Sequence, residues 1–210
     1  MIIIKKVFQW ARPLVPLKLS GVTAIALHHM EHLTAGMNDV HRWHLARGWK
    51  GFAYNWWIDF AGNIYECRGW HIGGGLFSPH NDTVISVGFQ GHYDITKTMP
   101  PAQFSAGYEL IRYLRNEVPT IALVAGHKHW QDKSCPGKYF PLGEMIDMAD
   151  KIQTIKDYDD VANWAKDAVQ NVVDSGIMIG DDQGRFNPKA NITRQEIAVV
   201  IDRLLQKIKS

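Results

Sequence analysis

A histidine and a cysteine eight residues apart carry the strongest chemical signal in the chain. They lie in a stretch that reads Gly126-His127-Lys128-His129 and then Cys135-Pro136-Gly137. An imidazole and a thiolate on one irregular loop can both reach a soft metal ion, and zinc takes nitrogen and sulfur ligands tetrahedrally. With a third protein ligand, one position stays open for water, as in catalytic zinc sites. Because such a zinc acidifies its water and polarises a carbonyl, the spacing predicts hydrolysis of an amide or ester.

The third ligand is expected at the end of an apolar run. Residues 22–27 (VTAIAL) predict a buried strand, which delivers its C-terminal end to His28 and His29. Successive side chains of a strand point to opposite faces, so alternation leaves the choice between these two histidines open. Most other histidines are expected in the scaffold or at the surface. His41 and His44 lie on a polar helix pattern, and we expect them to be solvated.

Strands that alternate with helices are expected to position these residues. Further strands are predicted at 52–60, 64–67, 84–89 and 121–125, and the first two of these form a hairpin around residues 61–63. Helices are predicted at 38–47, between the proline pair at 100–101 and Pro119, and at 142–152. The glycine-rich stretch 69–82 is predicted to be loop. The alternation indicates an α/β sheet domain.

The distribution of residue types divides the chain in two. All ten histidines, both cysteines and seven of the eight tryptophans precede residue 151, and Trp164 is the exception. Beyond a short polar connection the pattern is helical, with a capping box from Thr193 to Glu196 before the last helix. We therefore predict a domain at 1–152, a linker at 153–158 and a small all-α helix–loop–helix domain at 159–210.

Charge and hydropathy exclude several classes of protein. The net charge is +2, and the chain has no basic stripe of the kind that binds nucleic acid. No apolar run approaches the ~18 residues of a membrane span, and the apolar tripeptide before the first lysines is unlike a signal peptide. We expect the chain to be made in a cytoplasm without an export signal of its own.

Six short pieces of the first domain share the order and spacing of a known family. They are 26–29 (ALHH), 54–59 (YNWWID), 62–68 (GNIYECR), 81–88, 126–127 and 135–137. With them, residues 22–140 resemble the zinc-dependent N-acetylmuramoyl-L-alanine amidases of the type-2 amidase and peptidoglycan recognition protein family. The resemblance implies a central mixed β-sheet flanked by helices. It also implies one zinc ion held by His28, His127 and Cys135, and hydrolysis of the amide bond between N-acetylmuramic acid and L-alanine of peptidoglycan.

The resemblance also assigns roles to groups that do not bind metal. Tyr54 matches a tyrosine that faces the zinc water, and Lys133 matches a lysine two residues before the cysteine ligand. A phenol and an ammonium can stabilise negative charge on the carbonyl oxygen or help proton transfer. Asn81 and Trp70 are expected to contact substrate. The chain departs from many relatives at residues 73–75 (GGG), where they have Gly-Ala-His. A non-catalytic peptidoglycan-binding or wall-attachment protein on the same fold is the alternative function.

The second unit has matching pieces of its own. They are 160–161 (DV), 164–165 (WA), 176–180, 186–188 (FNP) and 193–196 (TRQE). With them, residues 157–207 resemble a single S-layer homology module, which implies binding to secondary cell-wall polysaccharide through Arg194 and Trp164. The planar guanidinium of Arg194 suits a carboxylate, although Gln195 replaces the small residue usual beside it. Packing, or self-association into a homo-oligomer that restores multivalency, is the alternative role.

Both resemblances together predict a protein of the bacterial cell wall. The expected function is that of a peptidoglycan hydrolase, and the missing export signal favours a phage or prophage endolysin that leaves the cell by a holin-type route. An autolysin that is exported by another route is the alternative origin.

Overall fold

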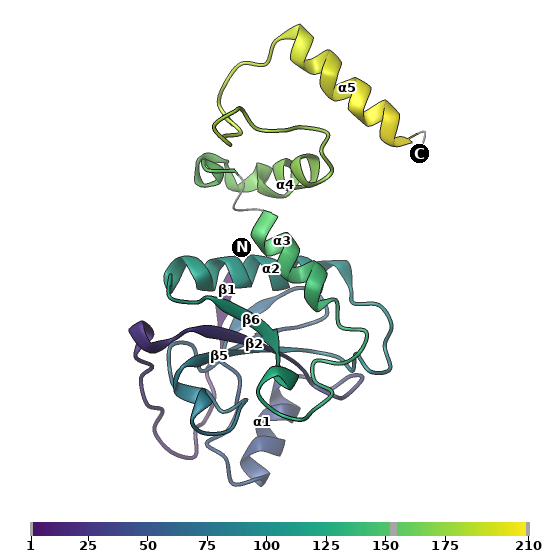
Figure 1. Ribbon diagram of the computed structural model, residues 1–210. Coiled ribbons are helices and arrows are strands. Elements are labelled where there is room, and N and C mark those ends of the chain that lie inside the picture. Colours follow the sequence, from purple (N-terminus) through teal and green to yellow (C-terminus); the bar gives the residue numbers. More distant parts are fainter. Residues whose placement is uncertain (1, 152–154, 209–210) are drawn as a thin grey trace. The chain divides into compact units, whose positions relative to one another are not determined.

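The computed structural model describes residues 2–151 and 155–208, and it divides the chain into two units (Figure 1). The first unit is Met1–Asp147 and the second is Met148–Ser210. Each unit has a hydrophobic cluster of its own. Residue 152 of the last predicted helix and residues 153 and 154 of the predicted linker lie outside the described residues.

A six-stranded mixed sheet forms the centre of the first unit, in the order β1-β4-β3-β5-β2-β6. The strands are β1 (Ile3–Lys5), β2 (Ala24–His29), β3 (Trp56–Ile58), β4 (Ile64–Glu66), β5 (Val84–Phe89) and β6 (Leu123–Gly126). The predicted hairpin is confirmed, because β3 and β4 pair antiparallel. The other neighbouring strands pair parallel. The mixed sheet with flanking helices that the resemblance implied is thus confirmed.

Helices cover both faces of this sheet. They are α1 (Met37–Ala46), α2 (Pro101–Glu117) and α3 (Leu142–Lys151). Figure 1 shows α1 on one side of the sheet, and α2 with the start of α3 on the other. All residues of β2 and β5 are buried between these layers. A strand that is buried on both faces reads as a continuous apolar run, which is why residues 84–89 were predicted with their observed bounds.

Two predictions, one about the extent of the strand at 52–60 and one about the exposure of His44, were wrong. The strand predicted at 52–60 is regular over Trp56–Ile58 alone. The N–H groups of Phe52 and Ala53 instead donate to Nδ1 of His41 (3.0 Å) and of His44 (3.1 Å) in α1. His44 is therefore buried and not solvated, and burial lowers its pKa to about 4. The polar pattern of α1 includes rings that hold the neighbouring segment.

After α3, the described residues of the second unit form a pair of α-helices and a small apolar cluster. The helices are α4 (Lys166–Asp174) and α5 (Arg194–Ile208), and the cluster buries Ile155, Val161 and Val169. The predicted capping box is confirmed, because Thr193 N–H donates to Glu196 Oε2 (2.7 Å) and Glu196 N–H donates to Thr193 Oγ1 (3.2 Å). The small all-α domain is thus confirmed. Several large apolar residues of α5 are exposed, namely Ile197, Ile201, Leu204, Leu205 and Ile208.

Short 3-10 turns join several elements, at Leu19–Gly21, His80–Asp82, His127–His129, Tyr158–Asp160 and Asn163–Ala165. The glycine-rich stretch 69–82 is loop as predicted, apart from the turn at its end. Within residues 2–151 and 155–208, no helix is both long enough and apolar enough to cross a membrane.

Candidate metal centre

The C-terminal end of β2 brings His28 to the centre of the sheet. This strand pairs with β5 on one side and β6 on the other, and His28 lies beside Gly88 of β5. The His28 side chain is buried, with 1% of the residue exposed. Because β2 pairs with a strand on each side, the sheet and not a loop determines where the imidazoles of His28 and His29 lie.

The end of β6 brings His127 and Cys135 together. Pro136 lies so close to Gly126 that a Cβ on residue 126 would be 2.4 Å from Pro136 Cδ. The N–H of Lys128 donates to the carbonyl of Cys135 at 2.9 Å. A glycine at the strand end therefore lets the loop that carries Cys135 (the cysteine loop) fold back onto the first turn after β6.

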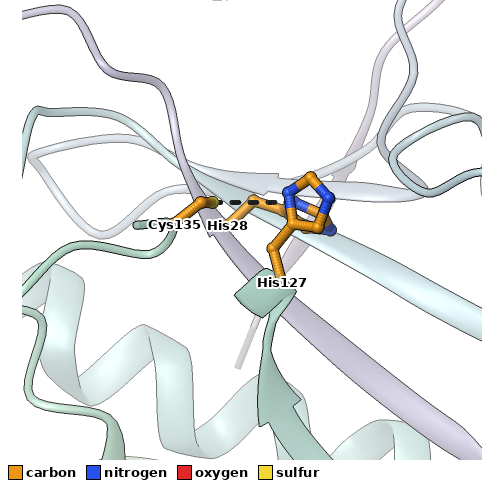
Figure 2. A group of neighbouring side chains, drawn as sticks. All are labelled: His28, His127 and Cys135. Atoms are coloured by element: carbon orange, nitrogen blue, oxygen red, sulfur yellow. Dashed lines mark hydrogen bonds between the residues drawn. The ribbon is translucent and has the colours of Figure 1, made fainter. Parts of the chain in front are cut away.

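Three side chains converge where these segments meet, as Figure 2 shows. His28, His127 and Cys135 each offer a ligand atom, and these atoms all lie within 4.8 Å of one another. The sulfur of Cys135 is 3.8 Å from Nδ1 of His28, and the two imidazole rings are 4.6 Å apart between centroids. Two nitrogens and one sulfur at this separation match the donor set of a zinc site with three protein ligands.

Hydrogen bonds determine which nitrogen of His127 can hold a metal. The amide oxygen of Gln131 is in close contact with Nε2 of His127. Because that oxygen only accepts, Nε2 carries the ring hydrogen and donates it, and Nδ1 keeps its lone pair. A neighbour that orients a histidine ligand in this way is usual around protein-bound zinc. With the Gln131 oxygen facing Nε2, the lone pair of His127 Nδ1 stays available.

The protonation states of the three groups also fit a metal ion. Burial, followed by the neighbouring His127, lowers the pKa of His28 well below its ordinary value. Burial likewise lowers the pKa of His127, so both rings are neutral at pH 7, as ligation requires. Burial raises the pKa of the Cys135 thiol to about 12, against the opposing effect of a hydrogen bond from the His29 backbone. A bound cation reverses that effect and takes the sulfur as thiolate.

His29 lies outside this centre, in a second group with His92 and Asp94. Its Nδ1 accepts the N–H of Tyr93 at 2.9 Å, so the ring hydrogen is on Nε2. That nitrogen is 3.6 Å from a Glu31 carboxylate oxygen and 3.9 Å from one of Asp94. A ring nitrogen that carries hydrogen has no lone pair for a metal. The second group is therefore unsuited to hold an ion through His29.

Tyr54 and Lys133 lie near the three converging side chains. The Tyr54 ring is 5.1 Å from the His28 ring between centroids, and it occupies space that Gly88 leaves free, since a Cβ there would be 2.6 Å from Tyr54 Cδ2. Burial raises the pKa of the Tyr54 phenol far above its ordinary value. Lys133 is exposed, and its charge acts to lower the pKa of both His127 and Cys135.

The remaining predicted residues are spread over other parts of the chain. Trp70 is partly buried, and its ring meets Trp56 edge-on with centroids 4.8 Å apart. Asn81 bonds the backbone of Leu76 through both its amide oxygen and its amide nitrogen, so it holds the glycine-rich loop. In the second unit, Arg194 is exposed at the start of α5, and Trp164 is 89% exposed.

Sequence reasoning missed residues that surround the centre, among them Gln131 and Arg68. The buried guanidinium of Arg68 donates to the carbonyls of Phe52 (2.6 Å), Ile72 (3.0 Å) and Gly73 (3.0 Å), and burial lowers its pKa to about 10. It therefore ties the glycine-rich loop to the segment that carries Tyr54. The position of Arg68 directly before the glycine-rich stretch 69–82 was the available signal in the sequence.

Comparison with known families gives two matches. The sequence profile of the N-acetylmuramoyl-L-alanine amidase family matches residues 18–138, which is more than half of the chain. The profile of the S-layer homology domain matches residues 154–198.

Individual proteins agree with both profiles. The chain is 30% identical over 104 residues to peptidoglycan-recognition protein SC2 of Drosophila melanogaster, an alignment that covers 48% of this chain and 56% of that protein. It is 38% identical over 52 residues to the surface-layer 125 kDa protein of Lysinibacillus sphaericus, covering 25% of this chain and 4% of that one. The chain thus spans little more than half the length of the first of these relatives.

A solved structure shows the same fold. It is titled an endolysine N-acetylmuramoyl-L-alanine amidase, LysCS, from Clostridium intestinale, and it superposes with a TM-score of 0.65 at 25% sequence identity. The superposition covers 71% of this chain and 95% of that one.

Proposed function

The chain belongs to the N-acetylmuramoyl-L-alanine amidase family and carries an S-layer homology domain, and from that premise we propose that it is a zinc-dependent peptidoglycan hydrolase. The bond cleaved is the amide between N-acetylmuramic acid and L-alanine of the stem peptide. One observation carries the proposal, namely the convergence of His28, His127 and Cys135 from three segments of the chain. The buried phenol of Tyr54 beside them adds a group suited to hydrolysis.

In this proposal each residue has a defined task. His28 and His127 would hold one zinc ion through neutral imidazole nitrogens, and Cys135 through its thiolate. When bound, zinc supplies Lewis acidity and an activated water. Gln131 keeps the His127 hydrogen on Nε2 and so leaves Nδ1 to the metal. The shell around the ligands therefore orients them before substrate arrives.

Tyr54 and Lys133 are proposed to stabilise the transition state. Attack on an amide builds negative charge on its carbonyl oxygen, and donors aimed at that oxygen lower the barrier. Because the pKa of Tyr54 is raised by burial, its hydroxyl keeps the hydrogen that it donates. Lys133 contributes a positive charge from the loop that carries Cys135. Trp70 would offer an aromatic surface to the substrate, while Asn81 would act through the loop that it holds.

The second unit is proposed to retain the enzyme at the cell wall by binding secondary cell-wall polysaccharide. The exposed guanidinium of Arg194 suits an anionic sugar substituent, and the exposed Trp164 offers a face for a sugar ring. Self-association is the second candidate role, because the apolar side chains of α5 are exposed. The mass of the full chain in solution, measured by light scattering, distinguishes one copy from several.

The likeness to an amidase titled an endolysine supports a phage or prophage origin, with action at the wall after release by a holin-type route. The alternative function is recognition of peptidoglycan without cleavage, which the names of the Drosophila relatives favour. The cysteine in the third ligand position favours the hydrolase, because it completes the donor set that catalytic zinc needs.

Zymography with the full chain on purified peptidoglycan tests the function. We expect clearing that a chelator abolishes and added zinc restores, and mass spectrometry of the digest should find stem peptides with a free N-terminal alanine. His28→Ala should abolish zinc binding while the matched variant His29→Ala retains it. Clearing that is indifferent to the chelator, or no clearing by a zinc-loaded protein, would refute the proposal.

A further inference from the structure

We propose that Asp94 is a positioning residue for the metal centre, because its carboxylate fastens the loop that presents Cys135. Asp94 follows β5 and has no part in the ligand set of the proposed zinc site. The inference rests on that site, since it concerns how one of its three ligands is held. It assigns a function to a residue that neither the sequence patterns nor the proposed mechanism uses.

The carboxylate of Asp94 bonds the cysteine loop on both sides of Cys135. Its Oδ2 accepts the hydroxyl hydrogen of Ser134 at 2.9 Å. Its Oδ1 accepts the backbone N–H of Lys138, also at 2.9 Å. Ser134 precedes the cysteine by one residue and Lys138 follows it by three. One side chain therefore spans the five-residue segment that contains the sulfur ligand.

Backbone contacts extend this attachment. The N–H of Tyr139 donates to the carbonyl of Tyr93 at 2.8 Å. Gly137 has a φ of +102°, and a Cβ there would lie 2.5 Å from the carbonyl carbon of Tyr93. Residue 137 must therefore be glycine for the two segments to lie this close. The Asp94 carboxylate therefore adds side-chain hydrogen bonds to a backbone contact between residues 93–94 and the cysteine loop.

The residue before Asp94 is itself anchored in the core. Tyr93 is fully buried, its N–H donates to Nδ1 of His29 on β2, and its hydroxyl is in close contact with the amide oxygen of Gln103 on α2. The residue next to Asp94 is thus attached to both the sheet and a helix. Through Asp94 the cysteine loop is held in the same frame that holds His28.

The charge of Asp94 opposes the thiolate that a metal needs. Among the causes that raise the pKa of the Cys135 thiol is the negative charge of Asp94. Bonds from Lys138, first, and from Ser134 lower the pKa of Asp94 itself, so it is ionised at neutral pH. The same negative charge attracts a bound dication, so Asp94 can act on the site through charge as well as through geometry. Asparagine, which keeps the shape and loses the charge, therefore separates the two effects.

The test is metal binding by the full chain, measured by competition with a chromophoric zinc chelator. Asp94→Ala should weaken zinc binding by about 10–100-fold, the usual effect of removing a group that orients a ligand. It should also change the thiolate-to-cobalt absorption of the cobalt-loaded protein. Asp94→Asn should bind zinc within about threefold of the wild type, because its amide can still accept from Lys138 and donate to Ser134.

Asp59→Ala is the matched control for a loss that is merely structural. Asp59 also fastens a turn, since its carboxylate accepts the backbone N–H (2.9 Å) and the side-chain amide (2.9 Å) of Asn63 in the β3–β4 hairpin. This variant should lower the melting temperature and leave zinc affinity and the cobalt spectrum unchanged. If Asp94→Ala does not fold, Ser134→Ala carries the test, with an expected loss of about threefold in zinc affinity.

Two results would overturn the inference. One is zinc affinity within twofold of the wild type in Asp94→Ala, or in Ser134→Ala where that variant carries the test. The other is an equal loss in Asp94→Asn and Asp94→Ala, which would assign the effect to charge. Both are distinct from failure of the proposed function, in which the wild-type chain itself binds no zinc or, when loaded, releases no alanine terminus.

Discussion

The candidate residues of the two units differ most in burial. In the first unit His28 and Cys135 are buried, and they meet His127 from separate segments. In the second unit Arg194 and Trp164 are exposed, and they belong to the start of one helix and to a turn. Hydrolysis needs groups held within a fraction of an ångström. Retention on a polymer needs accessible groups, and a fixed arrangement matters less.

The two units therefore lose the conformational entropy of their functional side chains at different stages. Folding of the first unit orders the proposed metal ligands before any ion binds, through Gln131 and the paired strands. The exposed side chains of the second unit lose their rotamer freedom only when a partner binds, which weakens each contact. We therefore expect large, localised effects of substitution in the first unit and small, graded effects in the second.

The largest expected effect is loss of the sulfur ligand. Cys135→Ser should reduce amide hydrolysis by about a thousandfold or more, because the metal contributes several kcal/mol to transition-state stabilisation. The same variant should be retained on cell wall as well as the wild type, since the second unit is unchanged. Hydrolysis is measured by the release of alanine N-termini, and retention by co-sedimentation with purified wall. Loss of both functions together would break the proposed division between the units.

The second effect concerns the phenol beside His28. Tyr54→Phe removes the hydroxyl donor and keeps the ring that packs against Gly88 and Trp57. We expect kcat to fall about a hundredfold, as for loss of one donor to the developing oxyanion, while zinc affinity stays unchanged. Steady-state kinetics on muropeptides, with zinc affinity as the control, measures this. A kcat within threefold of the wild type would remove Tyr54 from the mechanism.

The fold of the first unit could be predicted where its signals are local. Residues 84–89 and the hairpin around 61–63 were found because burial and turn chemistry leave patterns a few residues long. The end of the 22–27 run identified His28 and His29 as candidates, and strand alternation could not choose between them. Their opposite surroundings in the structure arise from pairing with β5 and β6, which no local pattern encodes.

The residues that sequence reasoning missed act over long separations or without periodicity. Asp94 bonds residues 40 and 44 positions later, and the three-residue strand β1 pairs with residues about 61 positions away. Gln131 lies on an irregular turn, where spacing from His127 predicts no contact. His44 was assigned to solvent because its helix face is polar, whereas its ring accepts a backbone N–H inside the core. A polar pattern alone does not distinguish these environments.

A smaller effect is expected at Arg194, which is proposed to bind wall polysaccharide. Arg194→Ala should weaken binding of the full chain to wall polysaccharide about tenfold, the loss of one charge-assisted interaction. The affinity of Arg194→Lys for the polysaccharide should lie between those of the wild type and Arg194→Ala, because lysine keeps the charge and loses the planar fork. Lys189→Ala, another exposed cation of this unit, is the matched control. Co-sedimentation with wall before and after removal of the polysaccharide measures the effect, and equal losses in Arg194→Ala and Lys189→Ala would indicate attraction without a specific site.

The effect that leaves activity at neutral pH unchanged is the response of each unit to acid. Burial lowers the pKa of His44 to about 4, below the ordinary value of about 6.5 in the unfolded chain. The unfolded state therefore binds more protons below pH 6.5, so the stability present above that pH is lost as the pH falls toward 4. For His44 alone the loss at pH 5 is about 2 kcal/mol, and the lowered pKa values of His28 and His127 act in the same direction. Residues 151–210 contain no histidine, so the second unit should lose no stability between pH 7 and 5.5.

Amide hydrogen exchange of the metal-free chain, resolved by peptide, compares the two units in one sample. His44→Asn should reduce the acid response of the first unit, because the asparagine oxygen can still accept the Ala53 N–H and does not titrate. The slowest-exchanging amides of β2 and β5 report on the first unit, and those of α4 on the second. An equal acid response in both units, or an undiminished response in His44→Asn, would show that the buried imidazoles do not govern the difference. A response that is confined to the first unit and reduced in His44→Asn would mean that the buried imidazoles of that unit set the lower pH limit of its fold.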